Sequence, residues 1–123
     1  MKNENVLGFK DFFQEKDHLC IVTEKLDMNL KKYLNIFYNN LKEADLKFIF
    51  TNIAMSIHYC HHNNIIHQDI KPENIFVNVD QDGNISDLKL GDFGSSKLVR
   101  GGKLKQVGKM GTIGYQAPEI ISG

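Results

Sequence analysis

The feature that most constrains this chain is the run H-Q-D-I-K-P-E-N, which extends from His67 to Asn74. The triplet D-F-G begins eighteen residues later at Asp92, and the triplet A-P-E begins at Ala117. The run holds a carboxylate, a lysine two positions later and an amide five positions later, and D-F-G supplies a second carboxylate. Such a set is suited to holding a metal-bound phosphate beside a hydroxyl. The spacing therefore predicts phosphoryl transfer.

Each residue type has its own use in that chemistry. Asp69 can accept a proton from an attacking hydroxyl or orient it, and Lys71 can place positive charge where the moving phosphoryl group becomes most anionic. Asn74 offers a neutral oxygen and Asp92 a charged one, and hard oxygen ligands of this kind suit Mg2+. A single Asp or Asn in a loop is more often a turn former or a helix cap. The functional interpretation therefore depends on the ordered set.

The three motifs resemble those of the eukaryotic protein kinase family. H-Q-D-I-K-P-E-N is similar to the family's catalytic loop, D-F-G to its metal-binding motif, and A-P-E to the end of its activation segment. The K-P-E inside the loop and the run G-T-I-G-Y-Q-A-P-E resemble the serine/threonine branch. The resemblance implies Asp69 as catalytic base, Lys71 as a contact of the ATP γ-phosphate, and Asn74 and Asp92 as Mg2+ ligands. It also implies that Thr112 braces Asp69 and Lys71.

The resemblance further implies an α+β, partial protein-kinase-like fold. Residues 1–24 would form the end of the N-lobe sheet. Residues 25–123 would form the hinge and the first part of the C-lobe, a helical core that carries the catalytic loop and the activation segment. His67 is expected to pack beside Phe93 and so hold the catalytic loop to the metal-binding motif.

The same resemblance predicts an adenine site. Glu24 to Leu26 would be the hinge, whose contacts with a nucleotide are made by the backbone. Thr23 would be the gatekeeper behind the adenine, and Phe76 the floor beneath it. Glu24, Leu26, Phe76 and Lys71 are therefore the predicted ATP-binding residues.

Parts of the family pattern have no counterpart in these 123 residues. The chain shows no G-x-G-x-x-G loop, no strand lysine with a glutamate partner, and no helical subdomain after Glu119. We therefore expect a serine/threonine protein kinase of which this chain is an incomplete catalytic domain, inactive as an isolated fragment. The alternative hypothesis is a catalytically inactive, truncated kinase-like module that binds or scaffolds other proteins.

Composition limits the partners and the compartment. With 15 basic and 15 acidic residues and 41% hydrophobic residues, the chain is typical of a soluble globular domain. The balanced charge argues against nucleic-acid binding, and the lack of an apolar run of about 18 residues argues against a membrane span. Cys20 and Cys60 are expected to be reduced thiols in an intracellular protein, cytoplasmic or nuclear. The expected partners are ATP with Mg2+ and a protein substrate with a Ser or Thr acceptor.

Hydrophobic periodicity predicts the elements around these motifs. Two strands joined by a charged turn form a hairpin, and a helix follows. A longer helix is capped by Asn40, ends near His62 and turns an apolar stripe toward the core. A second strand pair follows the catalytic loop. In order, these segments are Val6–Gln14, Leu19–Glu24, Asp27–Tyr38, residues 43–62 with the stripe Leu46, Ile49, Ile53, Ile57 and Cys60, then Ile75–Val77 and Leu88–Leu90.

Two stretches invite a metal-binding interpretation. Cys60, His61 and His62, with His58 nearby, suggest zinc, but adjacent helical residues point about 100° apart and cannot all meet one ion. Residues 78–85 match the first part of an EF-hand calcium loop, but its twelfth position is Lys89, not the required Glu. A solvated helix end and an Asp-Gly hairpin loop are the favoured interpretations.

The segment after D-F-G is basic and has no acceptor for regulatory phosphate. Its basic residues favour a solvated loop, with a docking strip for acidic peptide or phosphate as the alternative. No Ser, Thr or Tyr lies between Lys97 and Gly111, and Gln68 stands where many kinases carry an Arg that pairs with a loop phosphate. Activity is therefore expected not to depend on phosphorylation there. Glu73 is a candidate contact for a basic residue of the substrate. The basic residues are Lys97, Arg100, Lys103, Lys105 and Lys109.

Overall fold

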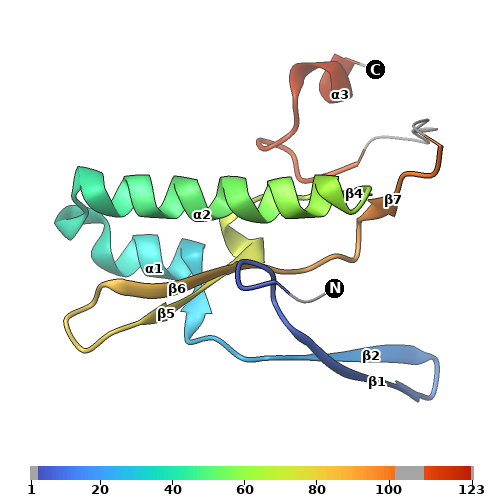
Figure 1. The fold of residues 1–123 in the computed structure, drawn as a ribbon, viewed down its shortest axis with the longest axis horizontal. Coiled ribbons are helices and arrows are strands. Elements are labelled where there is room, and N and C mark those ends of the chain that lie inside the picture. Colours follow the sequence, from blue (N-terminus) through green and yellow to red (C-terminus); the bar gives the residue numbers. More distant parts are fainter. Residues whose placement is uncertain (1–2, 102–109, 123) are drawn as a thin grey trace.

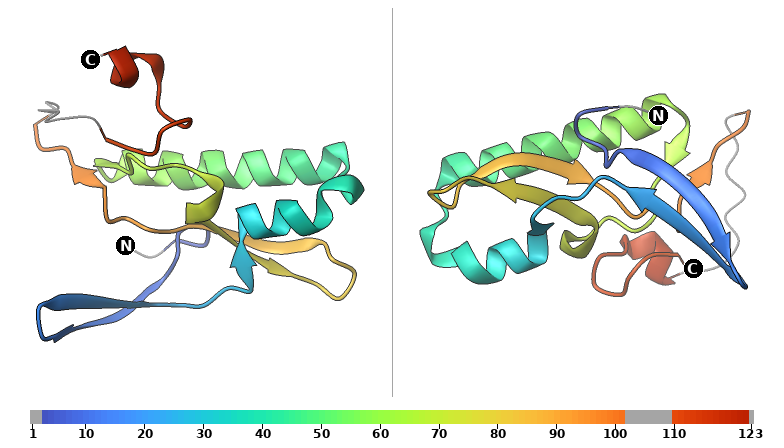
Figure 2. Two further views of the ribbon diagram at one scale, coloured as in Figure 1. Left: turned by 180° about the vertical axis from the view of Figure 1, so that it is seen from behind. Right: turned by 90° about the horizontal axis from the view of Figure 1, so that it is seen from below.

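The computed structural model describes residues 3–101 and 110–122. Within these ranges it has the predicted α+β architecture (Figure 1). The long helix α2 (Glu43–His62) lies across a small sheet, and the shorter helix α1 (Leu30–Phe37) packs below it. The C-terminal helix α3 (Pro118–Ser122) and the N-terminal β-hairpin lie on opposite sides of α2 (Figure 2, left).

The hairpin consists of β1 (Phe9–Glu15) and β2 (His18–Thr23), which pair antiparallel. The predicted hairpin is thereby confirmed. Its apolar side chains are exposed to solvent: Phe9, Phe12 and Ile21 are 59%, 61% and 64% exposed. The described residues therefore leave these strand faces uncovered, although their composition is that of a core.

The predicted start of the first strand at Val6 is wrong. Val6 is 3% exposed and forms a parallel bridge with Leu90, far from the hairpin. Leu7 N donates a hydrogen bond to Leu90 O at 2.8 Å, and Leu90 N donates to Asn5 O at 2.9 Å. The apolar pattern at this point reflects docking onto the body of the protein, which local periodicity does not distinguish from a strand of the hairpin.

Helix α1 begins later than its periodicity predicts. Met28–Asn29 forms the short strand β3, which pairs with β5 (Ile75–Val79), so the predicted helix start at Asp27 is wrong. Asn29 Oδ1 accepts a hydrogen bond from Lys32 N at 2.9 Å. An N-cap of this kind stabilises a helix by about 1 kcal/mol, which explains why the helix begins directly after Asn29.

The prediction that Asn40 caps α2 is wrong by two residues. Asn40 ends a short 3-10 helix (Tyr38–Asn40), and Lys42 takes the N-cap position with an extended backbone. Asp45 Oδ2 accepts a hydrogen bond from Lys42 N at 2.8 Å. Glu43 and Asp45 thus lie in the first turn, where negative charge interacts favourably with the helix dipole.

The buried face of α2 is centred on a serine. Ile49, Ser56 and Cys60 are 5%, 0% and 1% exposed, and Ser56 Oγ donates to Ile53 O at 2.7 Å. The predicted stripe is therefore right at Ile49 and Cys60. It is wrong at Leu46, which is 43% exposed. At 100° per residue Leu46 lies about 80° from Ser56 around the helix, and so at the edge of the buried face.

The central sheet has the order β3-β5-β6, with β6 spanning Ile85–Leu90. The predicted pair after the catalytic loop is confirmed, and both of its strands are longer than expected. It carries the best-buried apolar residues of the described chain, with Val77, Leu88 and Leu90 at 0%, 1% and 0% exposure. Burying a side chain of this size contributes about 1.5–3 kcal/mol, so this sheet is a firm support for the loops at its ends.

A further strand pair connects the segment before the catalytic loop with the segment after D-F-G. β4 (Ile65–Ile66) precedes the catalytic loop and pairs antiparallel with β7 (Lys97–Leu98), which follows D-F-G. The hydrogen bond from Val99 N to Asn64 O at 2.7 Å extends this contact. No helix in the described ranges combines the length and the apolar composition that a bilayer span requires.

Candidate active site

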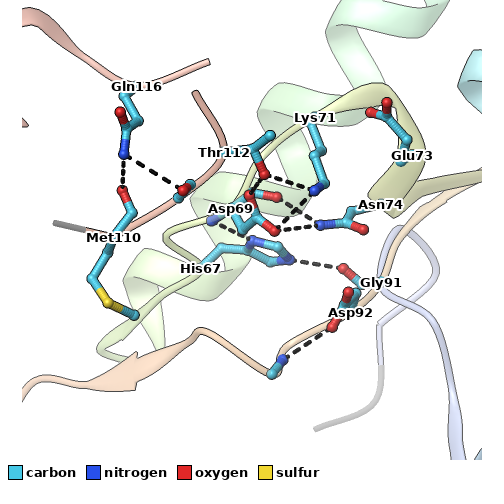
Figure 3. Close-up of polar contacts among 12 residues, drawn as sticks. His67, Asp69, Lys71, Glu73, Asn74, Gly91, Asp92, Met110, Thr112 and Gln116 are labelled. Atoms are coloured by element: carbon cyan, nitrogen blue, oxygen red, sulfur yellow. Dashed lines mark hydrogen bonds and ion pairs between the residues drawn. The ribbon is translucent and has the colours of Figure 1, made fainter. Parts of the chain in front are cut away.

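A buried histidine fixes the loop that follows β4. His67 is 4% exposed, and its ring meets Phe93 edge-on at a centroid distance of 4.9 Å, as predicted. His67 Nε2 bonds to Gly91 O at 2.8 Å, and Asp69 N donates to His67 Nδ1 at 3.2 Å (Figure 3). A carbonyl only accepts and an amide N–H only donates, so these partners fix the tautomer with its proton on Nε2. The histidine thus orients Asp69 and the D-F-G segment together.

Asp69 is the centre of a four-residue cluster (Figure 3). Thr112 Oγ1 donates to Asp69 Oδ1 at 2.6 Å and accepts from Lys71 Nζ at 2.7 Å. Lys71 Nζ lies 3.4 Å from Asp69 Oδ2, and Asn74 Nδ2 donates to the same oxygen at 3.1 Å. The structure therefore brings four predicted site residues together, although Thr112 is 43 positions from Asp69 in the chain.

The cluster keeps the Asp69 carboxylate charged. The hydrogen bond from Thr112 is the main cause that lowers the pKa of Asp69 below its usual value of 3.8, and the positive charge of Lys71 lowers it further. Partial desolvation acts in the opposite direction but does not prevail. At neutral pH Asp69 is thus an anion in a fixed orientation, which can accept a hydrogen bond from a hydroxyl and orient it.

Asp92 is held beside this cluster by backbone hydrogen bonds. Gly91 N donates to Asn74 O at 2.8 Å, which ties the residue before Asp92 to the end of the catalytic loop. Asp92 has a φ of 52°, and its Oδ1 accepts from Gly94 N at 3.2 Å. Within residues 3–101 and 110–122, no hydrogen bond joins the Asp92 side chain to Asp69 or Asn74. The structure brings Asp92 to the site without direct side-chain contact.

The remaining oxygens of Asn74 and Asp92 fit a hard cation. Asn74 turns its amide nitrogen toward Asp69, so its Oδ1 faces away from the cluster (Figure 3). Asp92 is exposed, and its Oδ2 has no hydrogen-bond partner among the described residues. Amide and carboxylate oxygens are ligands that Mg2+ accepts while it keeps several waters. The donor set is thus compatible with Mg2+, and the role of both residues as ligands stays a prediction.

The predicted hinge and the floor of the adenine site line one cavity of about 280 Å3. Glu24 Oε1 accepts from Gly8 N at 2.6 Å and from Lys89 Nζ at 2.9 Å. The bond to Lys89 is the main cause that lowers the pKa of Glu24. Glu24 N donates to Gly8 O at 2.8 Å, and the contact of the hinge backbone with a nucleotide stays a prediction. The cavity is lined by Leu7, Thr23, Glu24, Lys25, Leu26 and Phe76.

A glycine that sequence reasoning missed packs closely against two residues that line this cavity. A Cβ atom on Gly91 would lie 2.8 Å from Phe76 Cε2 and 3.0 Å from Leu7 Cδ2. The first contact is shorter than Cβ atoms show and the second is tight, so a larger residue at this position requires the side chains of Phe76 and Leu7 to shift. The available signal was its position directly before D-F-G. Leu7 was missed because its apolar character was attributed to the hairpin strand.

Replacing Gly91 with alanine is expected to lower the free energy of unfolding by about 1–3 kcal/mol, since the added methyl overpacks a closed contact. Denaturant unfolding of the full-length protein measures the change. A second variant in which Phe76→Leu accompanies Gly91→Ala should recover part of the loss, because the smaller side chain vacates the clashing position. Equal stability of Gly91→Ala and the wild type would contradict this account of the cavity.

A smaller groove of about 200 Å3 lies on the other side of Asp69. One wall is the segment that begins at residue 110, which contributes Thr112, Tyr115 and Gln116. Gln116 Nε2 donates to Met110 O at 2.9 Å, and this hydrogen bond holds the two ends of the segment together. Sequence reasoning did not identify this groove, because it forms only when residues after 110 fold back onto the catalytic loop.

The stretch that resembles a calcium loop is a hydrogen-bonded hairpin turn. Asp80 Oδ1 accepts from Asp82 N and from Asn84 N, each at 2.9 Å, and Gly83 has a φ of 84°. These bonds, first of all the one from Asn84 N, lower the pKa of Asp80. Strands β5 and β6 flank the turn, as the hairpin interpretation requires. In the described ranges no three His, Cys, Asp or Glu side chains are grouped as metal ligands.

The cluster considered for zinc is divided between the core and the surface. Cys60 is 1% exposed, and burial raises the pKa of its thiol. His61 and His62 are exposed, and the His62 ring stacks on His58 at a centroid distance of 6.3 Å. The buried Cys60 therefore points away from the exposed histidines. The exposure of His61 and His62 is that expected of a solvated helix end.

The basic segment after D-F-G is only partly described. Lys97 belongs to β7, and Arg100 is exposed. Lys103, Lys105 and Lys109 lie outside the described residues. The docking strip and the independence from loop phosphorylation therefore stay predictions.

A cavity lined by residues 23–26 and Phe76, a loop cluster built on Asp69 and an anchored D-F-G segment are arranged as in a protein-kinase-like fold. The family model described as the protein kinase domain matches residues 1–123. This chain belongs to the protein kinase domain family.

Two relatives illustrate this membership. Cyclin-dependent kinase-like 5 of Mus musculus and that of Homo sapiens are each 31% identical to this chain over 124 residues, a match that covers 100% of it. The chain spans 13% and 12% of the length of these two proteins. These matches support membership of the family, and they concern only a small part of each relative.

A solved structure shares the fold. The crystal structure of the yeast RNA Pol II CTD kinase CTDK-1 complex contains a chain that matches with a TM-score of 0.84 and 23% identity. The match covers 100% of this chain and 39% of that one. At this identity the likeness establishes the arrangement of helices and strands alone.

Proposed function

We propose that this chain forms part of the catalytic domain of a serine/threonine protein kinase that transfers the γ-phosphoryl group of ATP to a protein hydroxyl. The observation that carries the proposal is the cluster in which Thr112 bridges Asp69 and Lys71 while Asn74 supports Asp69. Its K-P-E sequence favours Ser and Thr acceptors over Tyr. In this proposal residues 1–24 end the N-lobe, and residues 25–123 supply the hinge and the first part of the C-lobe.

The proposed roles follow from the charges of the cluster. Asp69 accepts the hydrogen bond of the acceptor hydroxyl, orients it toward the phosphorus atom and takes its proton as the new O–P bond forms. Lys71, held by Thr112, places its ammonium beside the transferring group as the bond to the leaving ADP breaks. Lys71 and Asp69 are only 21% and 15% exposed, so their charges are less screened than those of surface groups.

The nucleotide would occupy the hinge-lined cavity, with its adenine against Leu26 and Phe76 and its polar edge toward the backbone of residues 24–26. Asn74 and Asp92 would hold Mg2+, which when bound neutralises charge on the phosphate oxygens. We place the protein inside the cell, in cytoplasm or nucleus, because Cys20 and Cys60 are free thiols. The proposed partners are ATP and a protein with a Ser or Thr acceptor.

The proposal is tested by incubating the full-length protein with radiolabelled ATP, Mg2+ and serine, threonine and tyrosine peptides. Label in Ser or Thr, dependent on Mg2+, is the expected result. Thermal unfolding with and without Mg-ATP provides a second measurement, since a bound ligand raises the melting temperature. No transfer and no shift of the melting temperature would reject the kinase and favour the catalytically inactive binding or scaffold module.

Thr112→Val tests the bracing hydroxyl, since valine keeps the shape and removes both hydrogen bonds. The pKa of Asp69 is lowered, so the active carboxylate is lost only as the pH falls below 3.8; without the Thr112 donor the pKa rises. We therefore expect the acid limb of kcat to move to higher pH and kcat to fall by about tenfold, the effect of one lost hydrogen bond to a charged group.

The matched control is Thr112→Ser, which keeps the hydroxyl and should retain the wild-type acid limb. Steady-state kinetics between about pH 3 and pH 8, with stability of each variant checked at every pH, provide the measurement. An unchanged acid limb in Thr112→Val would show that Thr112 does not act through Asp69.

A further inference from the structure

The ion pair between Lys31 and Glu73 joins two elements at the mouth of the candidate active site. Lys31 lies in the first turn of α1, and Glu73 lies in a 3-10 helix (Pro72–Asn74) that closes the catalytic loop. Lys31 Nζ donates to Glu73 Oε1 at 2.9 Å, across 42 positions of the chain. Their side chains are 59% and 32% exposed, so the pair faces solvent on one side and the protein on the other.

The two carboxylate oxygens of Glu73 have different surroundings. Oε1 holds Lys31, whereas Oε2 is buried and has no hydrogen-bond partner among the described residues. A buried, unpartnered oxygen makes an uncompensated charge on this carboxylate unfavourable, so the cation on Oε1 is important to it. Glu73 therefore has no free anionic oxygen to offer to a passing ligand.

Glu73 belongs to the same short loop as Asp69, which lines the groove. Glu73 is two residues from Lys71, whose ammonium contacts Asp69, and Figure 3 shows Glu73 beyond Lys71 on the same loop. Tyr115 lines the groove together with Asp69. A peptide whose hydroxyl reached Asp69 would thus pass near the pair.

Glu73 alone would present a negative charge to that peptide, as the sequence suggests for a basic substrate residue. We propose instead that the Lys31–Glu73 ion pair is a specificity-determining device, which withdraws the Glu73 carboxylate from the substrate and so removes a preference for arginine or lysine near the acceptor. This inference rests on the proposed function. Lys31 both occupies the carboxylate and repels a second cation, which is selection by a built-in unfavourable contact.

The test compares a neutral serine peptide with a set in which one arginine is moved through the positions on either side of the serine. The quantity measured is the ratio of kcat/KM for each arginine peptide to that for the neutral one, in the full-length protein. The wild type is expected to give ratios near or below one. Lys31→Ala should raise the ratio about 5-fold at one or two positions, since a newly formed charge pair at a partly exposed site is worth up to about 1 kcal/mol.

Three further variants make the result specific. Lys32→Ala removes the neighbouring lysine of α1, whose side chain makes no hydrogen bond or ion pair with the described residues, and should leave the ratios unchanged. Glu73→Gln alone should not raise the ratios and should lower them where the unneutralised Lys31 repels the arginine. Lys31→Ala with Glu73→Gln should lose the gain of Lys31→Ala, because the carboxylate that the arginine would meet is absent. The gain should appear in KM, since binding and not chemistry is altered.

Two results would overturn the inference. One is a wild-type preference for arginine that Lys31→Ala does not increase, and the other is a gain in Lys31→Ala that survives Glu73→Gln. Fluorescence anisotropy with the same peptides, their serine replaced by alanine, measures the ratio of binding constants without catalysis. If no peptide is phosphorylated but the anisotropy ratios follow the expected pattern, the proposed function fails while the selectivity of the groove stands.

Discussion

Asp69→Ala is expected to lower kcat of the full-length protein by about 10²–10⁴-fold, the usual contribution of a positioned general base. The variant removes the carboxylate that Thr112, Lys71 and Asn74 hold in place. Binding of Mg-ATP should remain nearly intact, because the cavity of the hinge and the oxygens of Asp92 are unaffected. Steady-state phosphorylation of a serine peptide gives kcat, and isothermal titration with Mg-ATP gives the binding constant.

Two controls separate chemistry from folding. Asp69→Asn keeps the size and part of the hydrogen bonding but loses the charge, so it should be nearly as slow as Asp69→Ala. Asp82→Ala makes the same chemical change as Asp69→Ala at an exposed hairpin tip, where the side chain has no described hydrogen bond, and should retain wild-type kcat. Turnover of Asp69→Ala within a factor of a few of the wild type would remove Asp69 from the catalytic role.

Asp92→Asn is expected to weaken binding of Mg-ATP by at least about 10–100-fold. Mutation of residues that only hydrogen-bond to a metal ligand already lowers metal affinity by this factor. Asparagine is the sharper substitution here, because Asp92 has a φ of 52° and Asn tolerates this left-handed backbone better than alanine. Its side-chain oxygen can also keep the hydrogen bond from Gly94 N. The change is therefore confined to one negative charge.

The decisive measurement is the dependence of ATP affinity on Mg2+ concentration. In the wild type the affinity should rise with Mg2+, and in Asp92→Asn the curve should shift to higher Mg2+ or become flat. Asp69→Ala serves as the reciprocal control, because it should keep the wild-type curve. Identical curves for Asp92→Asn and the wild type would show that this carboxylate holds no metal in the nucleotide complex.

Part of the fold could be predicted because it depends on local pattern. The strand pair after the catalytic loop and the long helix α2 follow from residues that alternate or recur at helical spacing. The errors occur where tertiary packing decides between equivalent local patterns. Val6 packs on Leu90 instead of joining β1, and Ser56 instead of Leu46 lies at the centre of the buried face of α2.

The candidate site divides in the same way. Asp69, Lys71 and Asn74 come from one short loop, so their spacing alone predicts that they lie together. Leu7 and Gly91 were missed because the sequence does not show which residues face one another at a cavity. The Lys31–Glu73 pair was missed because neither charge, taken in the sequence, indicates the other.

The sequence by itself determined which carboxylates, ammonium and amide are present, and their order predicts phosphoryl transfer. The tertiary structure alone decided how those groups are partnered. Thr112 reaches Asp69 across 43 positions and Lys31 reaches Glu73 across 42. Contacts at such separations require the closing of long loops, which depends on the packing of the whole core and not on the preference of any residue for its own conformation.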